Sequence, residues 1–371
     1  SFGSNGTHIR GLIISNNSDA GIYMISDNIK VKNCWIGLDS AGTAASSCAF
    51  GILIDITSSG DTIGGNGLSE RNVISGNNYG IQIFGTNNII AGNYVGTDVN
   101  GVTAVPNQQS GIDLNGALSN LIGGSMGYNL ISGNTLGSGV KLSNNSNNNS
   151  IQNNIFGLQV NLTDSLPNQA SIEIYNSKHN LVGGANVLDR NVICASTYGL
   201  NLFTGADSNE VVGNHFGYTP NFNLKRNDQS NIYISNSHYN FIGGTNIGEG
   251  NLLVPVPTAS LWMNNNSHDN FIRGNMFGTD PTGTIALGSR MGSAIQLNDA
   301  SYNIIGGNTS AHRNIIANSS TGVYMIGICV FNLIMNNHIG VDVSGSNVIS
   351  NNGGIYMDNG PAFNNIRGNV I

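Results

Sequence analysis

Residues 111–142 read GIDLNGALSNLIGGSMGYNLISGNTLGSGVKL and contain one complete unit of a repeat, followed by the start of the next unit. The unit holds three short apolar segments, at 112–114, 121–122 and 130–131, each bounded by Gly, Asn or Ser. In the first segment a polar residue separates two apolar residues, which is the period of a half-buried β-strand. Gly and Asn favour turns over helices, so this stretch predicts three short strands joined by tight turns.

The first of these segments recurs along the whole chain. Its copies are GIYM at 21, GILI at 51, GIQI at 80, GIDL at 111, GVKL at 139, SIEI at 171, GLNL at 199, NIYI at 231, SLWM at 260, AIQL at 294, GVYM at 322 and GIYM at 354. The second and fourth residues are always aliphatic or Met, whereas the third residue varies in chemistry. An aliphatic residue followed by two glycines also recurs, at Gly64, Gly123, Gly183, Gly243 and Gly306. A repeat of this length indicates a solenoid or a propeller-like array.

The number of strands in each repeat decides between these two architectures. A propeller blade needs four antiparallel strands in about 40 to 50 residues, whereas three strands recur here about every 30 residues without Asn-Gly hairpin turns. The sequence therefore predicts an all-β, right-handed parallel β-helix, a three-sided solenoid of about twelve coils. We expect residues 1–371 to form one β-helix domain. The pattern begins by Ile9 and stops within a strand at 369–371, so we expect an excised part of a longer chain, or ends that stack on neighbouring molecules.

The composition excludes several classes of partner. Charged residues make up 9% of the chain and the formal net charge is −7, with 13 Lys and Arg residues in total. A protein that binds nucleic acid needs a basic surface to neutralise phosphates, so we expect no nucleic-acid partner. No apolar run reaches the roughly 18 residues of a membrane span, and we expect none. Cys194 and Cys329 are expected to be buried apolar residues, while a bridge between Cys34 and Cys48 stays open.

Asparagines precede the apolar strands in equivalent registers of successive coils. They stand at 88, 120, 149, 180, 209, 240, 270, 303, 332 and 364. A buried Asn at a turn can satisfy backbone groups of its own coil and also bond the Asn amide of the next coil. We therefore expect a structural asparagine ladder.

Three further motifs resemble those of a known group of proteins. They are Asn120-Leu121-Ile122-Gly123-Gly124, Asn72-Val73-Ile74-Ser75-Gly76-Asn77 and Gly92-Asn93-Tyr94-Val95-Gly96-Thr97-Asp98. These motifs resemble the large bacterial secreted or surface proteins of the pectin-lyase-like superfamily, which are parallel β-helix repeat proteins. The resemblance implies an extracellular protein, secreted or on the cell surface. The superfamily includes polysaccharide lyases, glycosidases, epimerases, adhesins and stalks, so fold alone does not choose among them.

Two functions follow from this reading. We expect an extracellular structural or adhesive segment that contacts glycans, with self-association end to end or laterally as a further expectation. The alternative is a polysaccharide-active enzyme, either a lyase or an inverting glycoside hydrolase. The lyases of the superfamily that act by β-elimination need several carboxylates around a calcium ion, and this face has no tight acidic cluster, so we expect no cofactor and no metal ion.

The candidate catalytic residues are Asp113, Lys141 and Glu173, the variable third residues of three consecutive coils. At a rise of about 4.8 Å per coil, the two acids would stand about 9.6 Å apart, at or just beyond the upper end of the range of roughly 6.5 to 9.5 Å for inverting glycosidases. The competing interpretation is a cross-strand charge ladder. We expect Lys141 to lower the pKa of both carboxyl groups, which argues against a catalytic acid.

The candidate ligand-binding residues are aromatic. Tyr233 and Trp262 occupy the same position on adjacent coils, as do Tyr324 and Tyr356. Such rings can stack on sugar faces, although aromatic residues also favour strands for their own sake.

Two sets of residues, one of aspartates and one of histidines, resemble metal sites at first sight. Asp39, Asp98, Asp280 and Asp342 each begin a Gly-containing turn, but an Asx-turn explains them better than a shared cation. His238 and His268 occupy equivalent turns without a third ligand, so we expect no metal there.

Overall fold

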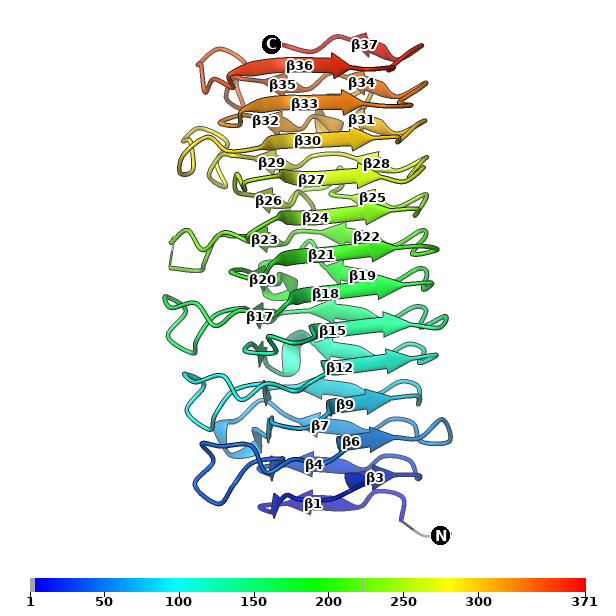
Figure 1. Cartoon of the computed structure of the whole chain (residues 1–371), viewed down its shortest axis with the longest axis vertical. Helices are drawn as coiled ribbons and strands as arrows, with labels where there is room; N and C mark the ends of the chain where they lie inside the picture. The colour runs from blue at the N-terminus through cyan, green and yellow to red at the C-terminus, as the bar shows by residue number, and fades with distance from the viewer. Residues whose placement is uncertain (1–3, 222) are drawn as a thin grey trace. The chain divides into compact units, whose positions relative to one another are not determined.

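The computed structural model of the chain describes residues 4–221 and 223–371. The chain folds as a right-handed parallel β-helix of about twelve coils, as the sequence predicts, and each coil gives one strand to each of three parallel sheets. We call these sheets A, B and C in the order in which a coil visits them. The residues group into two compact units, 1–181 with 194–196 and 182–193 with 197–371, which are described separately. Figure 1 shows the strands of each unit stacked coil upon coil, with the sheet C arrows toward the viewer.

In the first unit all three sheets are parallel, and neighbouring strands come from consecutive coils. Sheet A contains β1 (His8–Arg10), β4 (Lys30–Lys32), β7 (Thr62–Gly64), β10 (Ile89–Ala91), β13 (Leu121–Gly123) and β16 (Ser150–Gln152). Sheet B contains β2 (Ile13–Ile14), β5 (Trp35–Ile36), β8 (Val73–Ile74), β11 (Tyr94–Val95), β14 (Asn129–Ile131) and β17 (Asn154–Phe156). Sheet C contains β3 (Ala20–Met24), β6 (Phe50–Ile54), β9 (Tyr79–Ile83), β12 (Ser110–Asn115), β15 (Ser138–Ser143) and β18 (Ala170–Tyr175).

The second unit repeats this arrangement, and the boundary between the units falls within β19 (Leu181–Gly183). Sheet A contains β22 (Glu210–Val212), β25 (Phe241–Ile242), β28 (Phe271–Ile272), β31 (Ile304–Gly306), β34 (Leu333–Met335) and β37 (Asn365–Arg367). Sheet B contains β20 (Val192–Ile193), β23 (His215–Phe216), β26 (Leu252–Leu253), β29 (Met276–Phe277), β32 (Ile315–Ile316) and β35 (His338–Ile339). Sheet C contains β21 (Tyr198–Phe203), β24 (Ser230–Ser235), β27 (Ala259–Asn264), β30 (Ser293–Asn298), β33 (Thr321–Ile326) and β36 (Gly353–Asp358).

Among the described residues, four single-turn 3-10 helices connect sheet A to sheet B, each in a different coil. They are η1 (Leu68–Glu70), η2 (Gly124–Met126), η3 (Val187–Asp189) and η4 (Ser310–His312). None of the helices in the described part of the chain is long and apolar enough to span a membrane.

The core consists of columns of aliphatic side chains that point inward from sheet C. Ile52 pairs in register with Ile81, which pairs with Ile112, which pairs with Val140. All four side chains have no solvent-exposed surface. Burial of such a side chain is worth about 1.5–3 kcal/mol, so the alternation seen in the sequence is what fixes the register of the coils.

The predicted asparagine ladder is present. In the first unit the Asn88 side-chain amide donates to Asn120 Oδ1 at 3.0 Å, and Asn120 donates to Asn149 Oδ1 at 3.1 Å. Asn120 also donates to the backbone oxygens of Gly85 and Leu118, at 3.1 Å each. The ladder therefore satisfies the buried turns and links each coil to the next.

Two more ladders line the other corners, and the sequence analysis did not single them out. One links Asn72, Asn93, Asn129 and Asn154 in the first unit, and the other links Asn77, Asn107, Asn134 and Asn168. These asparagines stand before or after very short strands, so their spacing is less regular in the sequence.

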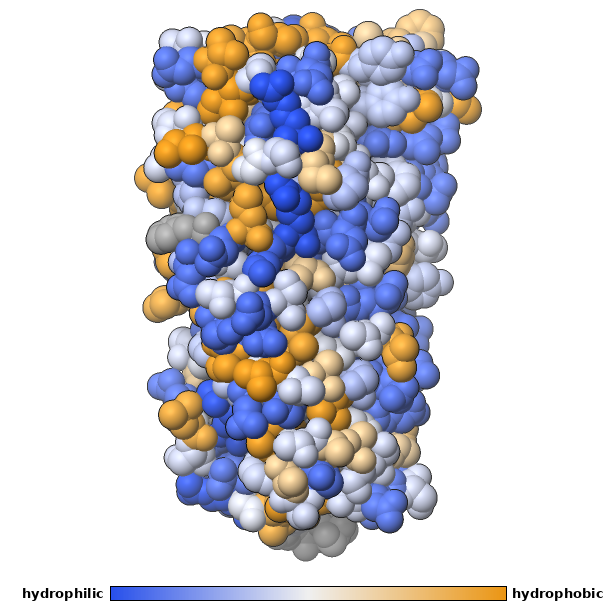
Figure 2. Space-filling view, turned by 60° about the vertical axis from the view of Figure 1, so that its left-hand side comes forward, coloured by the Kyte–Doolittle hydropathy of each residue, from blue (hydrophilic) through white to orange (hydrophobic). Residues whose placement is uncertain are grey.

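In the space-filling view, hydrophilic residues cover much of the visible surface, with hydrophobic patches between them (Figure 2).

The cysteines answer a question that the sequence left open. Cys34 and Cys48 are both buried free thiols, so the bridge between them is not formed. Cys194 and Cys329 are buried, as predicted.

The aspartate turns behave as Asx-type turns: Asp98 Oδ1 accepts hydrogen bonds from the backbone N–H groups of Val102 and Thr103, at 2.9 and 3.0 Å.

Candidate functional site

The three candidate catalytic residues lie side by side on sheet C of the first unit. Asp113 on β12 pairs in register with Lys141 on β15, which pairs with Glu173 on β18. Gln82 on β9 occupies the same column on the other side of Asp113. On each strand, the aliphatic residues on either side of the column point into the core. Because successive side chains of a strand point to opposite faces, the third residue of each segment points outward, and these outward residues lie beside one another on neighbouring strands.

The two carboxyl groups of the column have different partners. The Gln82 side-chain amide donates to Asp113 Oδ2 at 2.9 Å. The Lys141 ammonium lies 4.0 Å from Glu173 Oε1, and the Ser138 hydroxyl donates to Glu173 Oε2 at 3.2 Å. Asp113 is therefore held by a neutral amide, whereas Glu173 is held by a cation and a hydroxyl.

Burial changes the acidity of Asp113. Its side chain is 4% exposed, and burial raises the pKa of this carboxyl group above its usual range. The hydrogen bond from Gln82 and the charge of Lys141 act in the opposite direction, but their effect is smaller. Lys141 thus lowers the pKa of Asp113 as expected, but the net shift is upward, because the cost of placing a carboxylate away from water exceeds the attraction of the nearby ammonium.

A surface hollow surrounds this column. It has a volume of about 420 Å³ and is lined by Tyr79, Gln82, Gln109, Ser110, Asp113, Asn115, Lys141, Ser143, Asn144, Glu173 and Tyr175. We call it the Asp113 hollow. It brings together carboxyl, amide, ammonium and hydroxyl groups between Tyr79, which begins its strand, and Tyr175, which ends its strand. The sequence analysis missed both tyrosines, because they lie at strand ends outside the four-residue segments that it aligned.

The aromatic candidates lie on sheet C of the second unit and pair as predicted. Tyr233 and Trp262 are in register, with ring centroids 4.9 Å apart. Tyr324 and Tyr356 are also in register, with centroids 5.4 Å apart. Phe203 packs edge-on against Tyr233 at 5.6 Å, which enlarges the first pair into a cluster.

Buried polar atoms without partners occur on the same strands as the aromatic cluster. Among the described residues, the Asn201 side-chain oxygen, the Ser230 hydroxyl and the Trp262 ring nitrogen are buried and have no hydrogen-bond partner. Asn201 pairs in register with Tyr233, and Tyr233 pairs with Trp262. Unpaired buried polar groups are uncommon in proteins, so their occurrence together calls for a partner such as water or a ligand.

The two histidines in equivalent turns stack on each other. The ring centroids of His238 and His268 are 3.7 Å apart, and His268 Nδ1 lies 2.8 Å from a carboxylate oxygen of Asp269. The described residues include no group of three or more metal-binding side chains of the His, Cys, Asp or Glu type.

No protein-family model matches the chain, and no curated protein matches it. Among solved structures, the chain is similar to the Dettilon tailspike protein, with 16% sequence identity and a TM-score of 0.55 over 94% of this chain and 61% of that one. The enzymatically active domain of bacteriophage CBA120 tailspike protein 2 matches with 12% identity and a TM-score of 0.38, over 85% of this chain and 43% of that one. A double mutant of the E. coli bacteriophage HK620 tailspike, in complex with a pentasaccharide, matches with 10% identity and a TM-score of 0.35, over 92% of this chain and 59% of that one.

The likeness to the Dettilon protein supports the parallel β-helix fold. The chain spans about 61% of the length of that tailspike. Membership of the pectin-lyase-like superfamily stays a prediction.

Proposed function

We propose that this chain binds a polysaccharide through sheet C, with the Asp113 hollow as the main binding site. The observation that carries the proposal is the hollow itself, in which polar groups of several kinds converge between two tyrosine side chains. Ligand sites are concave and combine apolar or aromatic surface with a few well-placed polar groups. Sugars match such a site because their hydroxyls both donate and accept hydrogen bonds while their ring faces pack on aromatic rings.

The aromatic cluster of Tyr233, Trp262 and Phe203 supports the proposal independently. Tyr233 and Trp262, whose ring centroids lie 4.9 Å apart, would provide the stacking surface for a sugar ring. The cluster would then be a second contact region for the same class of ligand. Tyr324 and Tyr356 would extend the same function along sheet C.

Hydrolysis of the bound glycan is the second candidate function, and the raised pKa of Asp113 favours it. A carboxyl group with a raised pKa holds its proton to higher pH than usual and can donate it to a glycosidic oxygen. Glu173, about 9.6 Å away at two coil rises, would accept a proton from the water that attacks the anomeric carbon. This separation lies at or just beyond the upper end of the range for inverting enzymes and well outside the roughly 5 to 5.5 Å of retaining enzymes, so the predicted product has inverted configuration.

A glycan-array screen, combined with a reducing-sugar and unsaturated-uronate release assay on the same polysaccharides, tests both functions. We expect wild type to bind at least one glycan, and we expect Glu173→Gln or Tyr175→Ala to weaken that binding about tenfold or more. Tyr302→Ala removes an exposed ring of the turn between sheets C and A and should leave binding unchanged. Turnover that disappears in Glu173→Gln and Asp113→Asn would establish the hydrolase. Binding by wild type that all the sheet C variants retain would contradict the proposal.

The same proposal places the protein outside the cell, as a secreted or surface-displayed adhesive segment of the pectin-lyase-like type. A surface solvated by amides and hydroxyls with few charges is suited to a polysaccharide environment. End-to-end or lateral association of chains remains a prediction.

A further inference from the structure

One register position of the second unit changes abruptly from arginine to glycine and back. It is the residue immediately before the asparagine that leads into each sheet B strand, and in successive coils it is Arg190, Gly213, Gly250, Gly274 and Arg313. Three consecutive coils therefore lack a side chain at this position, while the flanking coils carry a guanidinium group.

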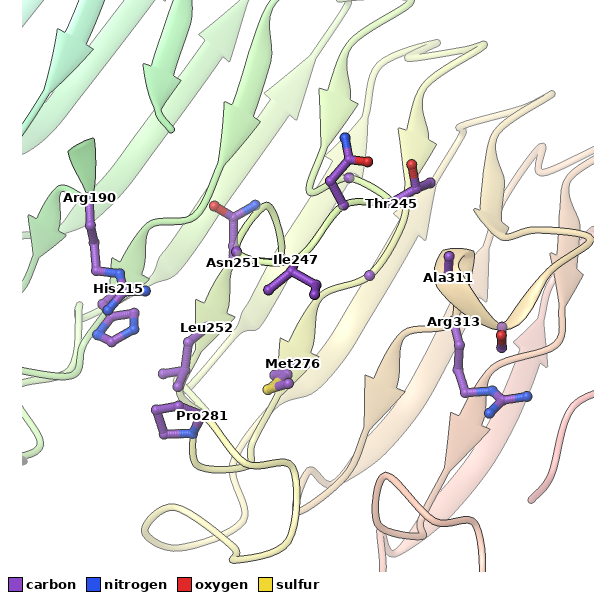
Figure 3. A pocket seen from close by; sticks show the side chains of 16 residues that line it. Arg190, His215, Thr245, Ile247, Asn251, Leu252, Met276, Pro281, Ala311 and Arg313 are labelled. Carbon is purple, nitrogen blue, oxygen red and sulfur yellow. The ribbon is translucent and has the colours of Figure 1, made fainter. Parts of the chain in front are cut away.

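A surface groove lies between the two arginines and is lined by Gly250 and Gly274. It has a volume of about 570 Å³, and its walls include Arg190 and His215 at one end and Arg313 at the other. Leu252, Met276 and Pro281 lie between these ends, beside the loop that carries Ile247 (Figure 3). We call it the Arg190 groove.

The two arginines of the groove have no acidic partner among the residues that the structure describes. Arg190 uses its Nε to donate to the Gly213 backbone oxygen at 3.0 Å, and Arg313 uses its Nε to donate to the Asn336 backbone oxygen at 3.2 Å. Within residues 4–221 and 223–371, neither guanidinium takes part in an ion pair, and their terminal nitrogens have no hydrogen-bond partner. Burial lowers the pKa of Arg190, which shows that its charge is costly where it stands.

The acids next to groove residues in the sequence, Asp189 and Glu249, accept hydrogen bonds within their own turns. Asp189 accepts a hydrogen bond from the Asn186 side-chain amide at 2.9 Å. Glu249 accepts from the backbone and side chain of Asn246, at 2.9 and 2.7 Å. These carboxylates therefore cap loops and do not line the groove, whose lining residues include two arginines and no acid.

Arg71 shows what arginine does at this register when it is structural. Its guanidinium lies 4.0 Å from the centre of the Tyr94 ring, on the next coil of the first unit, in a cation–π contact. Arg190 faces His215 at the equivalent place, and burial together with the charge of Arg190 lowers the pKa of His215 to about 3. His215 is thus a neutral wall of the groove and does not add charge to it.

We propose that the Arg190 groove binds a linear oligosaccharide that carries anionic groups, with Arg190 and Arg313 each holding one carboxylate or sulfate. Four coil rises separate the two arginines, about 19 Å, which is too far for one small anion to reach both. The planar guanidinium matches such groups with two parallel hydrogen bonds. Nucleic acid fits less well, because His215 is the one aromatic-type ring among the lining residues, leaving no platform for stacked bases. The choice of a sugar backbone rests on the proposed function, whereas the need for anionic groups does not.

Titration calorimetry with defined oligosaccharides tests this proposal. Oligogalacturonates and sulfated oligosaccharides of the same length should bind wild type, and the fully methyl-esterified oligogalacturonate should bind at least about tenfold more weakly. Arg190→Gln and Arg313→Gln should each weaken anionic binding at least about tenfold, and raising the salt concentration should weaken it in wild type. The relative affinity of the carboxylated and sulfated series then identifies the preferred anion.

Matched variants keep the result interpretable. Arg71→Gln changes the same register in the first unit and should leave anionic binding unchanged. Arg190→Lys keeps the charge and should retain part of the affinity, which separates a binding role from a folding defect. Equal affinity for the esterified and free oligogalacturonates, undiminished binding in both Gln variants, or no binding of either anionic series would overturn the proposal. Asp113→Asn and Glu173→Gln should not affect this binding, so failure of the Asp113 hollow as a glycan site would be seen separately.

Discussion

The ammonium group of Lys141 lies 4.0 Å from a carboxylate oxygen of Glu173, one coil away on sheet C. Asp113, one coil away on the other side, instead accepts a hydrogen bond from the Gln82 amide. Two acids in one column therefore experience different surroundings, although the backbone places them in equivalent positions. Because of this difference, Asp113 is the candidate proton donor, whereas Glu173 is the partner of Lys141. Substitution of each residue of the column can therefore test its role separately.

The first prediction concerns the charge of Lys141. In Lys141→Gln, the pKa of Asp113 should rise further, because the nearby ammonium lowers it in wild type. NMR titration of a carbon-labelled aspartate side chain measures this pKa directly. Lys30→Gln, an exposed substitution on β4 of sheet A, should leave it unchanged. An unchanged or lower Asp113 pKa in Lys141→Gln would show that the two groups are not coupled.

The second prediction concerns the stability cost of burying Asp113. The pKa of this carboxyl group is raised in the folded state. Its contribution to the stability of the fold is therefore lost as the pH rises above the unfolded-state pKa of about 3.9. Asp113→Asn should therefore raise the free energy of unfolding at pH 7, and the gain should disappear below about pH 3.9. Parallel denaturant unfolding at pH 7 and pH 3 measures this difference, with the exposed Asp228→Asn as the control. A variant that is less stable than wild type at pH 7 would contradict the argument.

The third prediction concerns His215, which is 9% exposed and has a pKa of about 3. The unfolded-state pKa of His is about 6.5, so between about pH 6.5 and pH 3 the imidazole is protonated in the unfolded chain but not in the folded one. The free energy of unfolding therefore falls as the pH falls through this range. Wild type should lose about 2 kcal/mol more than His215→Gln between pH 6.5 and pH 5. Unfolding curves at both pH values give this difference, and exposed His8→Gln should behave like wild type. Parallel losses in wild type and His215→Gln would show that His215 is protonated in the fold.

The fourth prediction concerns the asparagine ladder. Asn120→Ala should lower the free energy of unfolding by about 1–3 kcal/mol, because it leaves the buried amide of Asn88 and backbone oxygens below it without partners. Asn66→Ala removes an exposed asparagine from a turn and should change stability by less than about 0.5 kcal/mol. Thermal or denaturant unfolding of the two variants provides the comparison. Equal effects of both substitutions would mean that the ladder is not a source of stability.

Most of the fold could be predicted from the sequence because the same physical choice recurs in every coil. Ile112 and Leu114 stand on either side of Asp113, and each of the other coils has an equivalent apolar pair. This pattern predicts both the register of the sheet C strands and which of their side chains point into the core. The ladder through Asn88 and Asn120 followed from a similarly regular spacing. The corner ladder through Asn77 and Asn107 was missed because loops of different length separate its members.

The site was predictable in outline only. The stacking of Asp113, Lys141 and Glu173 follows from register, but burial of the Asp113 carboxyl does not, because it depends on how neighbouring side chains close over it. The Arg190 groove was also missed, although the run of Gly213, Gly250 and Gly274 between two arginines is visible once the coils are aligned on sheet B. Aligning all three strands of a coil, and not only the sheet C segment, would have revealed it.

The central claim is that the Asp113 hollow binds a polysaccharide, and the most direct test is an experimental structure of the chain with the array-selected oligosaccharide bound. We predict sugar rings over β12, β15 and β18, with hydroxyls bonded to Asp113 or Glu173 and a ring packed on Tyr79 or Tyr175. An oligosaccharide that is well ordered elsewhere on the chain, with the Asp113 hollow left empty at saturating concentration, would contradict the claim.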